Sequence, residues 1–193
     1  MIVVVLDTNM VIEFHRESER LERISRCVVD FLMGLFRLSG SDRVVVVVCY
    51  SRTKRELRRE SIKLFGERIK DRLCGDLRVV RGLRLKSLSK IVDPNVYEDV
   101  RRMVLCDRGL LRVLRGVVKG AKGVDLARGN VVREVDEDVH LFLKALYMSK
   151  GARLVKIVTG DHKARDNLLD LVDSLKEKCG RDFGIEVCYV NIR

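Results

Sequence analysis

The chain has no tryptophan, no glutamine, one proline and only five asparagines among its 193 residues. Scarce thermolabile amides together with abundant Lys, Arg and Glu are typical of proteins from hyperthermophiles. Aromatic residues make up 5% of the chain, so the sequence indicates no platform of rings for stacking single-stranded bases. No apolar run approaches the length of a membrane span, and residues 1–6 are too short for a signal peptide. We therefore expect a soluble, cytoplasmic protein.

Six cysteines are present, but none forms a C-x-x-C pair, which disfavours a zinc ribbon or a redox motif. The formal net charge is +11 and the sequence pI is about 9.6. Residues 72–133 contain 15 Lys and Arg against six Asp and Glu, so most of the excess positive charge lies there. A charge of this size favours a polyanionic partner, with nucleic acid the first candidate. The alternative is a charge-rich surface of a thermophilic protein.

Short runs rich in β-branched residues predict buried parallel strands at four places. They are residues 2–6, 43–49, 154–158 and 185–190. Apolar residues at helical spacing predict helices between them, over residues 18–38, 53–70, 137–149 and 163–178. This alternation predicts an α/β fold with a mostly parallel sheet of about four strands. Residues 72–133 lack such strand runs and carry a helical stripe after Asp93-Pro94, which predicts a basic helical insertion.

Carboxylates fall where the predicted strands end. Asp7 follows the first strand, Glu56 lies about one turn into the helix after the second, Asp138 opens the helix before the third, and Asp161 follows the third. Ligand sites of open parallel sheets form beyond the carboxyl ends of the strands. Carboxylates that converge there stay ionised only if a cation neutralises them, and oxygen ligands select Mg²⁺ or Mn²⁺. Each acid taken alone also fits a helix cap or a first helical turn.

Four segments, VVVLDTNMVI, SRTKRE, DVHLFLKA and IVTGD, resemble in order the motifs of the PIN-domain nucleases. The resemblance covers roughly residues 1–71 and 134–193 and leaves 72–133 as the insertion. It implies a three-layer α/β/α fold and metal-dependent endonucleolytic hydrolysis of RNA, leaving a 5′-phosphate and a 3′-hydroxyl. It assigns catalysis and metal binding to four acids: Asp7, Glu56, Asp138 and Asp161. Asn9 and Thr159 would support the pocket, and the further candidate ligands are Glu134, Asp136 and Asp166.

Within this family, a VapC-like toxin or another archaeal-type PIN ribonuclease is the leading interpretation. The toxin interpretation implies an antitoxin protein as a partner and a homo-oligomer, dimeric or larger. The alternative is HARP, the small protein-only RNase P that processes the 5′ end of tRNA, which Glu134, the Glu137-Asp138-Val139 segment and the insertion resemble. Two other classes are a non-catalytic RNA-binding protein with a degenerate pocket and an aspartyl-nucleophile phosphatase. The phosphatase needs a second Asp where this chain has Asn9.

Two basic groups are predicted to contact RNA. One flanks Glu56 and comprises Arg52, Arg55 and Arg59. The other lies in the insertion, where Arg112, Arg115 and Lys119 recur at three- and four-residue steps and so share one helix face. Contacts of Lys and Arg with phosphates do not depend on sequence, so we expect recognition of RNA shape. A solvated helix face is the alternative for both groups.

Overall fold

A computed structural model gives the fold of the parts of the chain that can be described. These are residues 1–7, 9–12, 30–31, 34, 44–48, 83–85, 108–119, 124–125, 130–131 and 136–191. The predicted helix over 53–70 lies outside the described residues, and so does the predicted helix over 18–38 except for residues 30, 31 and 34. None of the described helices combines the length and the apolar character that a membrane span requires.

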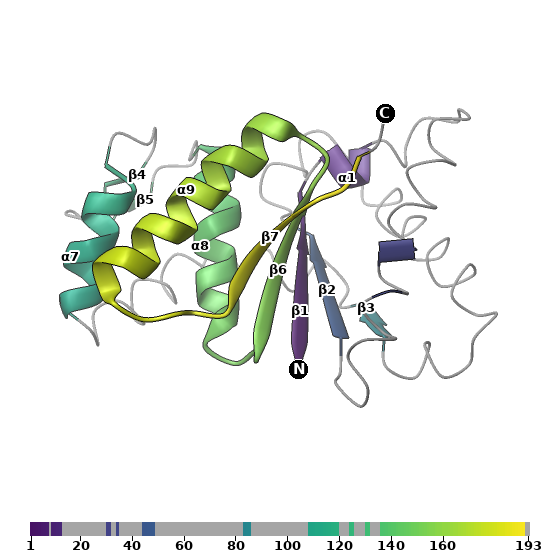
Figure 1. Ribbon diagram of the computed structural model, residues 1–193, viewed down its shortest axis with the longest axis horizontal. Helices are drawn as coiled ribbons and strands as arrows, with labels where there is room; N and C mark the ends of the chain where they lie inside the picture. The colour runs from purple at the N-terminus through teal and green to yellow at the C-terminus, as the bar shows by residue number, and fades with distance from the viewer. Residues whose placement is uncertain are drawn as a thin grey trace.

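The protein has a mixed α/β fold built on a parallel sheet (Figure 1). The described strands of this sheet are β1 (Ile2–Leu6), β2 (Val44–Val48), β3 (Leu83–Leu85), β6 (Leu154–Thr159) and β7 (Ile185–Tyr189). Their order is β3-β2-β1-β6-β7, and every neighbouring pair is parallel. Each of the four predicted strand regions therefore contains a strand. Val and Ile dominate β1 and β2, and such branched side chains suit a pleated strand.

The sheet has five described strands where about four were predicted, and the additional strand is β3. It lies inside residues 72–133, where the sequence suggested helix only. Three residues, Leu-Arg-Leu, are too few to show strand periodicity, and only pairing with β2 identifies them as a strand. Two further strands, β4 (Val124–Asp125) and β5 (Asn130–Val131), form a separate antiparallel pair in the same range.

The helices that cover the sheet follow the predicted ones closely. They are α8 (Glu137–Ser149) and α9 (His162–Cys179), whose predicted ranges were 137–149 and 163–178. Asp136 caps the start of α8 and Asp161 caps the start of α9. Gly180 ends α9 in the left-handed conformation, with φ 63°, which a residue without Cβ adopts at little cost. A one-turn helix, α1 (Asn9–Ile12), follows β1.

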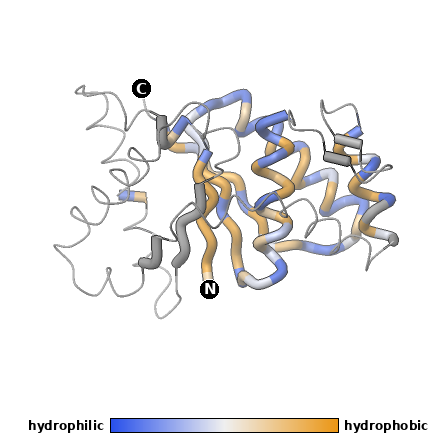
Figure 2. Tube along the Cα trace, turned by 180° about the vertical axis from the view of Figure 1, so that it is seen from behind, coloured by the Kyte–Doolittle hydropathy of each residue, from blue (hydrophilic) through white to orange (hydrophobic). Residues whose placement is uncertain are grey.

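The core lies between the sheet and these helices. Val3 and Val5 of β1 and Ile157 of β6 join one buried cluster with Phe142 of α8 and Leu168 of α9. Ile2, Val4 and Leu6, which alternate with them along β1, are buried as well, so the strand is covered on both faces as its composition predicts. In Figure 2 the central strands are almost continuously hydrophobic, whereas the helices alternate between hydrophobic and hydrophilic residues.

Part of the predicted insertion belongs to this core. The helix α7 (Arg108–Val117) contacts α9 and lies beyond it, on the side away from β2 and β3 (Figure 1). Leu110 and Leu114, with Val118 after the helix, are buried in the core cluster. The basic side chains predicted to share an adjoining helix face, Arg112, Arg115 and Lys119, are exposed. The segment is thus amphipathic, with an apolar side on the core and a basic side in solvent.

The turn into β7 depends on a second glycine. Gly184 has φ 63°, and a Cβ at this position would lie 2.9 Å from the carbonyl oxygen of Arg153. Its own carbonyl accepts a hydrogen bond from the Val155 amide at 2.7 Å. Only glycine therefore allows the chain to pass this close to the start of β6 and to place β7 in register with it.

Candidate active site at the carboxyl edge of the sheet

The order in which strands are added to the sheet changes direction at β1. The chain runs outward from β1 to β2 and β3, and it later returns to the other side of β1 with β6 and β7. A crevice forms at such a switch point beyond the carboxyl ends of the two diverging strands, and ligands of open α/β sheets bind there. Asp7 directly follows β1, and Thr159-Gly160-Asp161 ends β6 and opens α9. Two of the four predicted acids therefore flank the switch point.

Asp7 is held in place by a buried hydrogen-bond network. Its side chain is only 4% exposed, and that of Thr159 is fully buried. The Thr159 hydroxyl donates to Asp7 Oδ2 at 2.6 Å, and Asn9 Nδ2 donates to the same oxygen at 2.9 Å. Asn9 Nδ2 also lies 3.2 Å from Thr159 Oγ1. Asn9 and Thr159, both predicted as polar supports of the pocket, thus contact Asp7 directly.

The same network fixes the turn that carries Asp161. The Gly160 amide donates to Asn9 Oδ1 at 3.2 Å, and the Asp161 amide donates to Thr159 Oγ1 at 3.0 Å. In the described part of the chain, no buried side-chain nitrogen or oxygen lacks a hydrogen-bond partner. Asn9 therefore joins the loop after β1 to the loop after β6, which keeps Asp7 and Asp161 in a fixed relation.

Asp161 acts as the N-cap of α9. Its Oδ1 accepts hydrogen bonds from the amides of Lys163 at 2.7 Å and Ala164 at 3.3 Å. Both bonds use one carboxylate oxygen, and the side chain is exposed. The capping role that the sequence also suggested is thus realised. It does not exclude metal binding, because Oδ2 takes no part in the cap.

Asp138 stands in the first turn of α8 and is half-buried. Asn167 Nδ2 of α9 donates to its Oδ2 at 2.8 Å. Burial is the main cause that raises the pKa of the Asp138 carboxyl, and the hydrogen bond from Asn167 acts in the opposite direction. The negative charges of Asp136, Glu137 and Asp161 raise this pKa further. Asp138 and Asp161 are therefore within electrostatic reach of one another.

The charge of Asp138 is expected to destabilise the metal-free protein. Because its folded pKa lies above the ordinary value of 3.8, the folded protein binds this proton more tightly than the unfolded chain. Stability therefore falls as the pH rises from the ordinary pKa of aspartate through the raised pKa of folded Asp138. Asp138→Asn keeps the shape and an acceptor for Asn167, so we expect the melting temperature at pH 7 in a chelator to rise by about 1–3 °C.

Thermal melting of Asp138→Asn beside Asp170→Asn, an exposed carboxylate on α9, measures this effect. We expect the control to change the melting temperature by less than about 1 °C. The difference between Asp138→Asn and the parent protein should disappear below the ordinary pKa of aspartate. A lower melting temperature for Asp138→Asn at pH 7 would contradict the prediction.

The other predicted ligands have separate roles or cannot be placed. Asp136 caps α8 through a hydrogen bond of 3.2 Å from the Asp138 amide to its Oδ1. Asp166 is exposed and pairs with the guanidinium of Arg165 at 2.7 Å. Glu56 and Glu134 lie outside the described residues, as do three predicted RNA contacts, Arg52, Arg55 and Arg59. Among the described residues, no three His, Cys, Asp or Glu side chains gather closely enough to hold a metal ion by themselves.

Two contacts of this region were missed by the sequence analysis. Asn167 was not singled out, although it is the only described side chain that donates a hydrogen bond to Asp138. The stacked rings of His162 and Tyr189 were not predicted either. Asn167 lies one to two turns after Asp161 on the predicted helix, and a polar residue at that spacing is the only signal in the sequence.

Comparison of the chain with protein-family models, with curated proteins and with solved structures gives no match. The resemblance to PIN-domain nucleases thus stays an interpretation of the sequence motifs. The positions of Asp7 and Asp161 at the carboxyl edge of the sheet are a separate observation that bears on function.

Proposed function

We propose that the protein is a metal-dependent endoribonuclease with a PIN-like three-layer α/β/α core. The observation that carries the proposal is the placement of Asp7 and Asp161 at the switch point of a parallel sheet, with Asp138 in electrostatic reach of Asp161. Acidic side chains at such an edge, on a protein of net charge +11, suit a cation and a polyanionic substrate together. In this proposal residues 1–71 and 134–193 form the catalytic core, and 72–133 form the insertion.

The donor set suits Mg²⁺ or Mn²⁺. Only carboxylate oxygens are offered by Asp7, Asp138 and Asp161, and hard divalent ions prefer such ligands. Burial is the main cause that raises the pKa of Asp138, and the nearby charges of Asp136, Glu137 and Asp161 raise it further; a bound cation would oppose both effects. Among the described residues these three do not gather closely enough to hold an ion by themselves, so in the proposal Glu56 would complete the ligand set. When bound, the ion would neutralise charge on the phosphodiester and make water more acidic.

The contribution of the protein itself is preorganisation. Asp7 accepts two hydrogen bonds on Oδ2 from Asn9 and Thr159, so its carboxylate has a single orientation before any substrate arrives. Asp161 is held by the two amides that it caps, and Asp138 by Asn167. Carboxylates fixed in this way would lose little conformational entropy on binding a metal ion.

The proposal is tested by incubating the protein with a total RNA pool and mapping the cleaved ends. We expect cuts that require Mg²⁺ or Mn²⁺, stop in a chelator and leave a 5′-phosphate and a 3′-hydroxyl. Cuts mainly at the mature 5′ end of precursor tRNA would favour the HARP-type function. Cuts at other sites would favour a toxin or general ribonuclease, for which an antitoxin and a homo-oligomer are the expected partners.

A parallel calorimetric titration distinguishes the catalytic proposal from a binding protein. Heat of binding is expected when Mg²⁺ or Mn²⁺ is added at millimolar concentration. RNA binding without metal binding and without cleavage would favour the non-catalytic alternative and overturn the proposal.

A further inference from the structure

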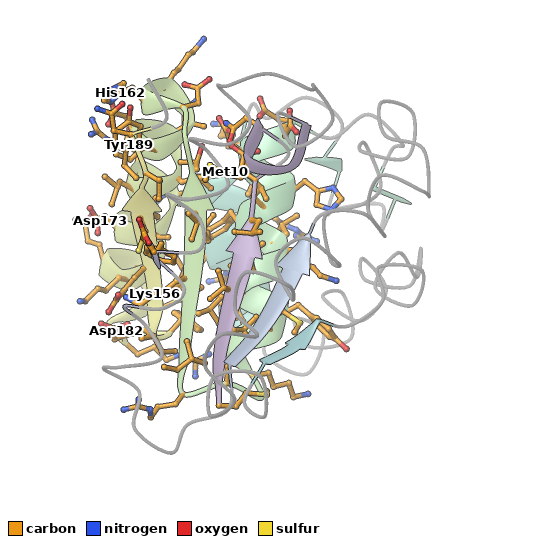
Figure 3. The ribbon with its side chains drawn as sticks, turned by 90° about the vertical axis from the view of Figure 1, so that its right-hand side faces the viewer. Met10, Lys156, His162, Asp173, Asp182 and Tyr189 are labelled. Atoms are coloured by element: carbon orange, nitrogen blue, oxygen red, sulfur yellow. The ribbon has the colours of Figure 1, made fainter. Side chains whose placement is uncertain are left out.

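Two aromatic rings stack on each other beside the candidate active site. His162 opens α9 and Tyr189 ends β7. Their ring centroids are 4.1 Å apart and the ring planes differ by 26°. The guanidinium carbon of Arg165 lies 5.4 Å from the centroid of the Tyr189 ring. Figure 3 shows His162 and Tyr189 together, near the end of the sheet toward which β1 points.

The backbone places these rings next to the network of Asp7. Tyr189 is in register with Thr159, and the amide of Val190 donates to the Thr159 carbonyl at 3.0 Å. Thr159 is the residue whose hydroxyl binds Asp7. His162 directly follows Asp161. The ring pair therefore lies one strand away from Asp7 and one residue away from Asp161.

Core packing does not account for the position of the histidine. His162 is exposed, whereas Tyr189 is half-buried beneath it. One face of the imidazole rests on the tyrosine, which fixes its plane. The cation beside the stack is Arg165, over the Tyr189 ring, and Lys163, the residue after His162, is exposed as well. A fixed aromatic surface with neighbouring cations suits a nucleobase and the phosphates that flank it.

We propose that the His162–Tyr189 pair is a stacking platform for a nucleobase of single-stranded RNA, beside Asp7 and Asp161 at the carboxyl edge of the sheet. That the strand passes these acids in order to be cut rests on the proposed function, whereas the stacking does not require cleavage. The occupant is a single-stranded segment because a base that is paired in a helix does not expose its face. The pair thus holds the chain across the carboxyl edge of the sheet, beside the acids.

Binding of a short single-stranded RNA that contains 2-aminopurine tests this role, because stacking on an aromatic ring quenches its fluorescence. The measurement is made in a chelator so that no strand is cut. We expect the parent protein to quench the probe. His162→Ala should abolish the quenching and weaken binding roughly five- to hundredfold. His162→Phe keeps a flat ring at this position and should restore both.

Lys163→Ala is the matched control, since it removes a cation next to the platform and leaves the rings in place. It should reduce the salt dependence of binding and keep the quenching. Circular dichroism establishes that each variant is folded, and Tyr189→Leu, which removes the supporting ring, should reproduce the effect of His162→Ala. Unchanged quenching in both His162→Ala and Tyr189→Leu would overturn the inference, and so would a His162→Phe variant that fails to restore it.

The two proposals fail in different ways. If the protein quenches the probe through His162 but cuts no RNA with Mg²⁺ or Mn²⁺, the platform stands and the nuclease proposal falls. If the protein cuts RNA and all variants quench the probe equally, the nuclease proposal stands and the platform falls.

Discussion

Asp7→Asn is expected to lower the rate of Mn²⁺-dependent RNA cleavage by roughly 100- to 1000-fold, because it removes a charge at the centre of the proposed site. The substitution is nearly isosteric. An amide oxygen in place of Oδ2 still accepts the hydrogen bonds from Asn9 and Thr159, so the network is retained. The second oxygen becomes an NH₂ group, which repels a cation. Cleavage of a labelled single-stranded RNA at saturating Mn²⁺ measures the effect.

Asp173→Asn is the matched control for this experiment. It makes the same chemical change at an exposed position on α9, away from the switch point (Figure 3). We expect its cleavage rate to equal that of the parent protein. The stability of Asp7→Asn in a chelator should be unchanged or higher, since a buried charge has been removed. A cleavage rate near that of the parent protein would remove Asp7 from the site and with it the central support for the nuclease proposal.

Strands and helices were predictable where the sequence carries a long or distinctive pattern. The valine-rich runs of β1 and β2 predicted buried parallel strands, and apolar residues at helical spacing predicted α8 and α9. The limits of α9 were predicted within one residue because Asp161 and Gly180 are strong start and stop signals. In contrast, β3 has three residues and acquires its identity from β2, which no local pattern encodes.

The site was predictable to the extent that it depends on where strands end. Asp7, Asn9 and Thr159 were expected together, and the structure joins them by hydrogen bonds because β1 and β6 are neighbours. The stack of His162 on Tyr189 requires that β7 pair with β6 and that α9 start directly after the turn. His162 and Tyr189 are 27 positions apart, so their contact depends on the tertiary arrangement. The aromatic content of 5% gave no indication of it.

The helix α7, which lies in the predicted insertion, both packs on the core and carries exposed positive charge. Leu110 and Leu114 on α7 contribute to the core, while Arg112 and Arg115 are exposed on the same helix. Lys178 of α9 adds a further cation, since its Nζ lies 3.5 Å from the position of a Cβ at Gly116. A basic surface of this kind attracts phosphates by releasing their counterions. We therefore propose that α7 contributes to RNA binding through its exposed cations, separately from its packing.

Neutralising the basic side of α7 is therefore expected to weaken the binding of a folded RNA stem by roughly 10- to 100-fold near 0.1 M salt. The variant carries three substitutions: Arg112→Gln, Arg115→Gln and Lys119→Gln. Each cation that contacts a phosphate contributes just under one unit to the slope of log affinity against log salt, so the slope should flatten by up to about three units. Cleavage of a short single-stranded RNA should hardly change, because these residues lie outside the acidic network. Filter binding over a series of salt concentrations measures the slope.

The control removes three positive charges from other exposed residues, at the amino end of the sheet, and it comprises Lys150→Gln, Arg153→Gln and Arg181→Gln. It changes the net charge equally, so a general effect of charge would flatten the slope in both variants. A flattened slope in the α7 variant alone indicates direct phosphate contacts. Loss of an oligomer with an unchanged slope would instead place α7 at an interface between copies of the chain. An unchanged slope with an unchanged oligomeric state would leave Arg112, Arg115 and Lys119 as a solvated surface, since charge that contacts no phosphate releases no counterions.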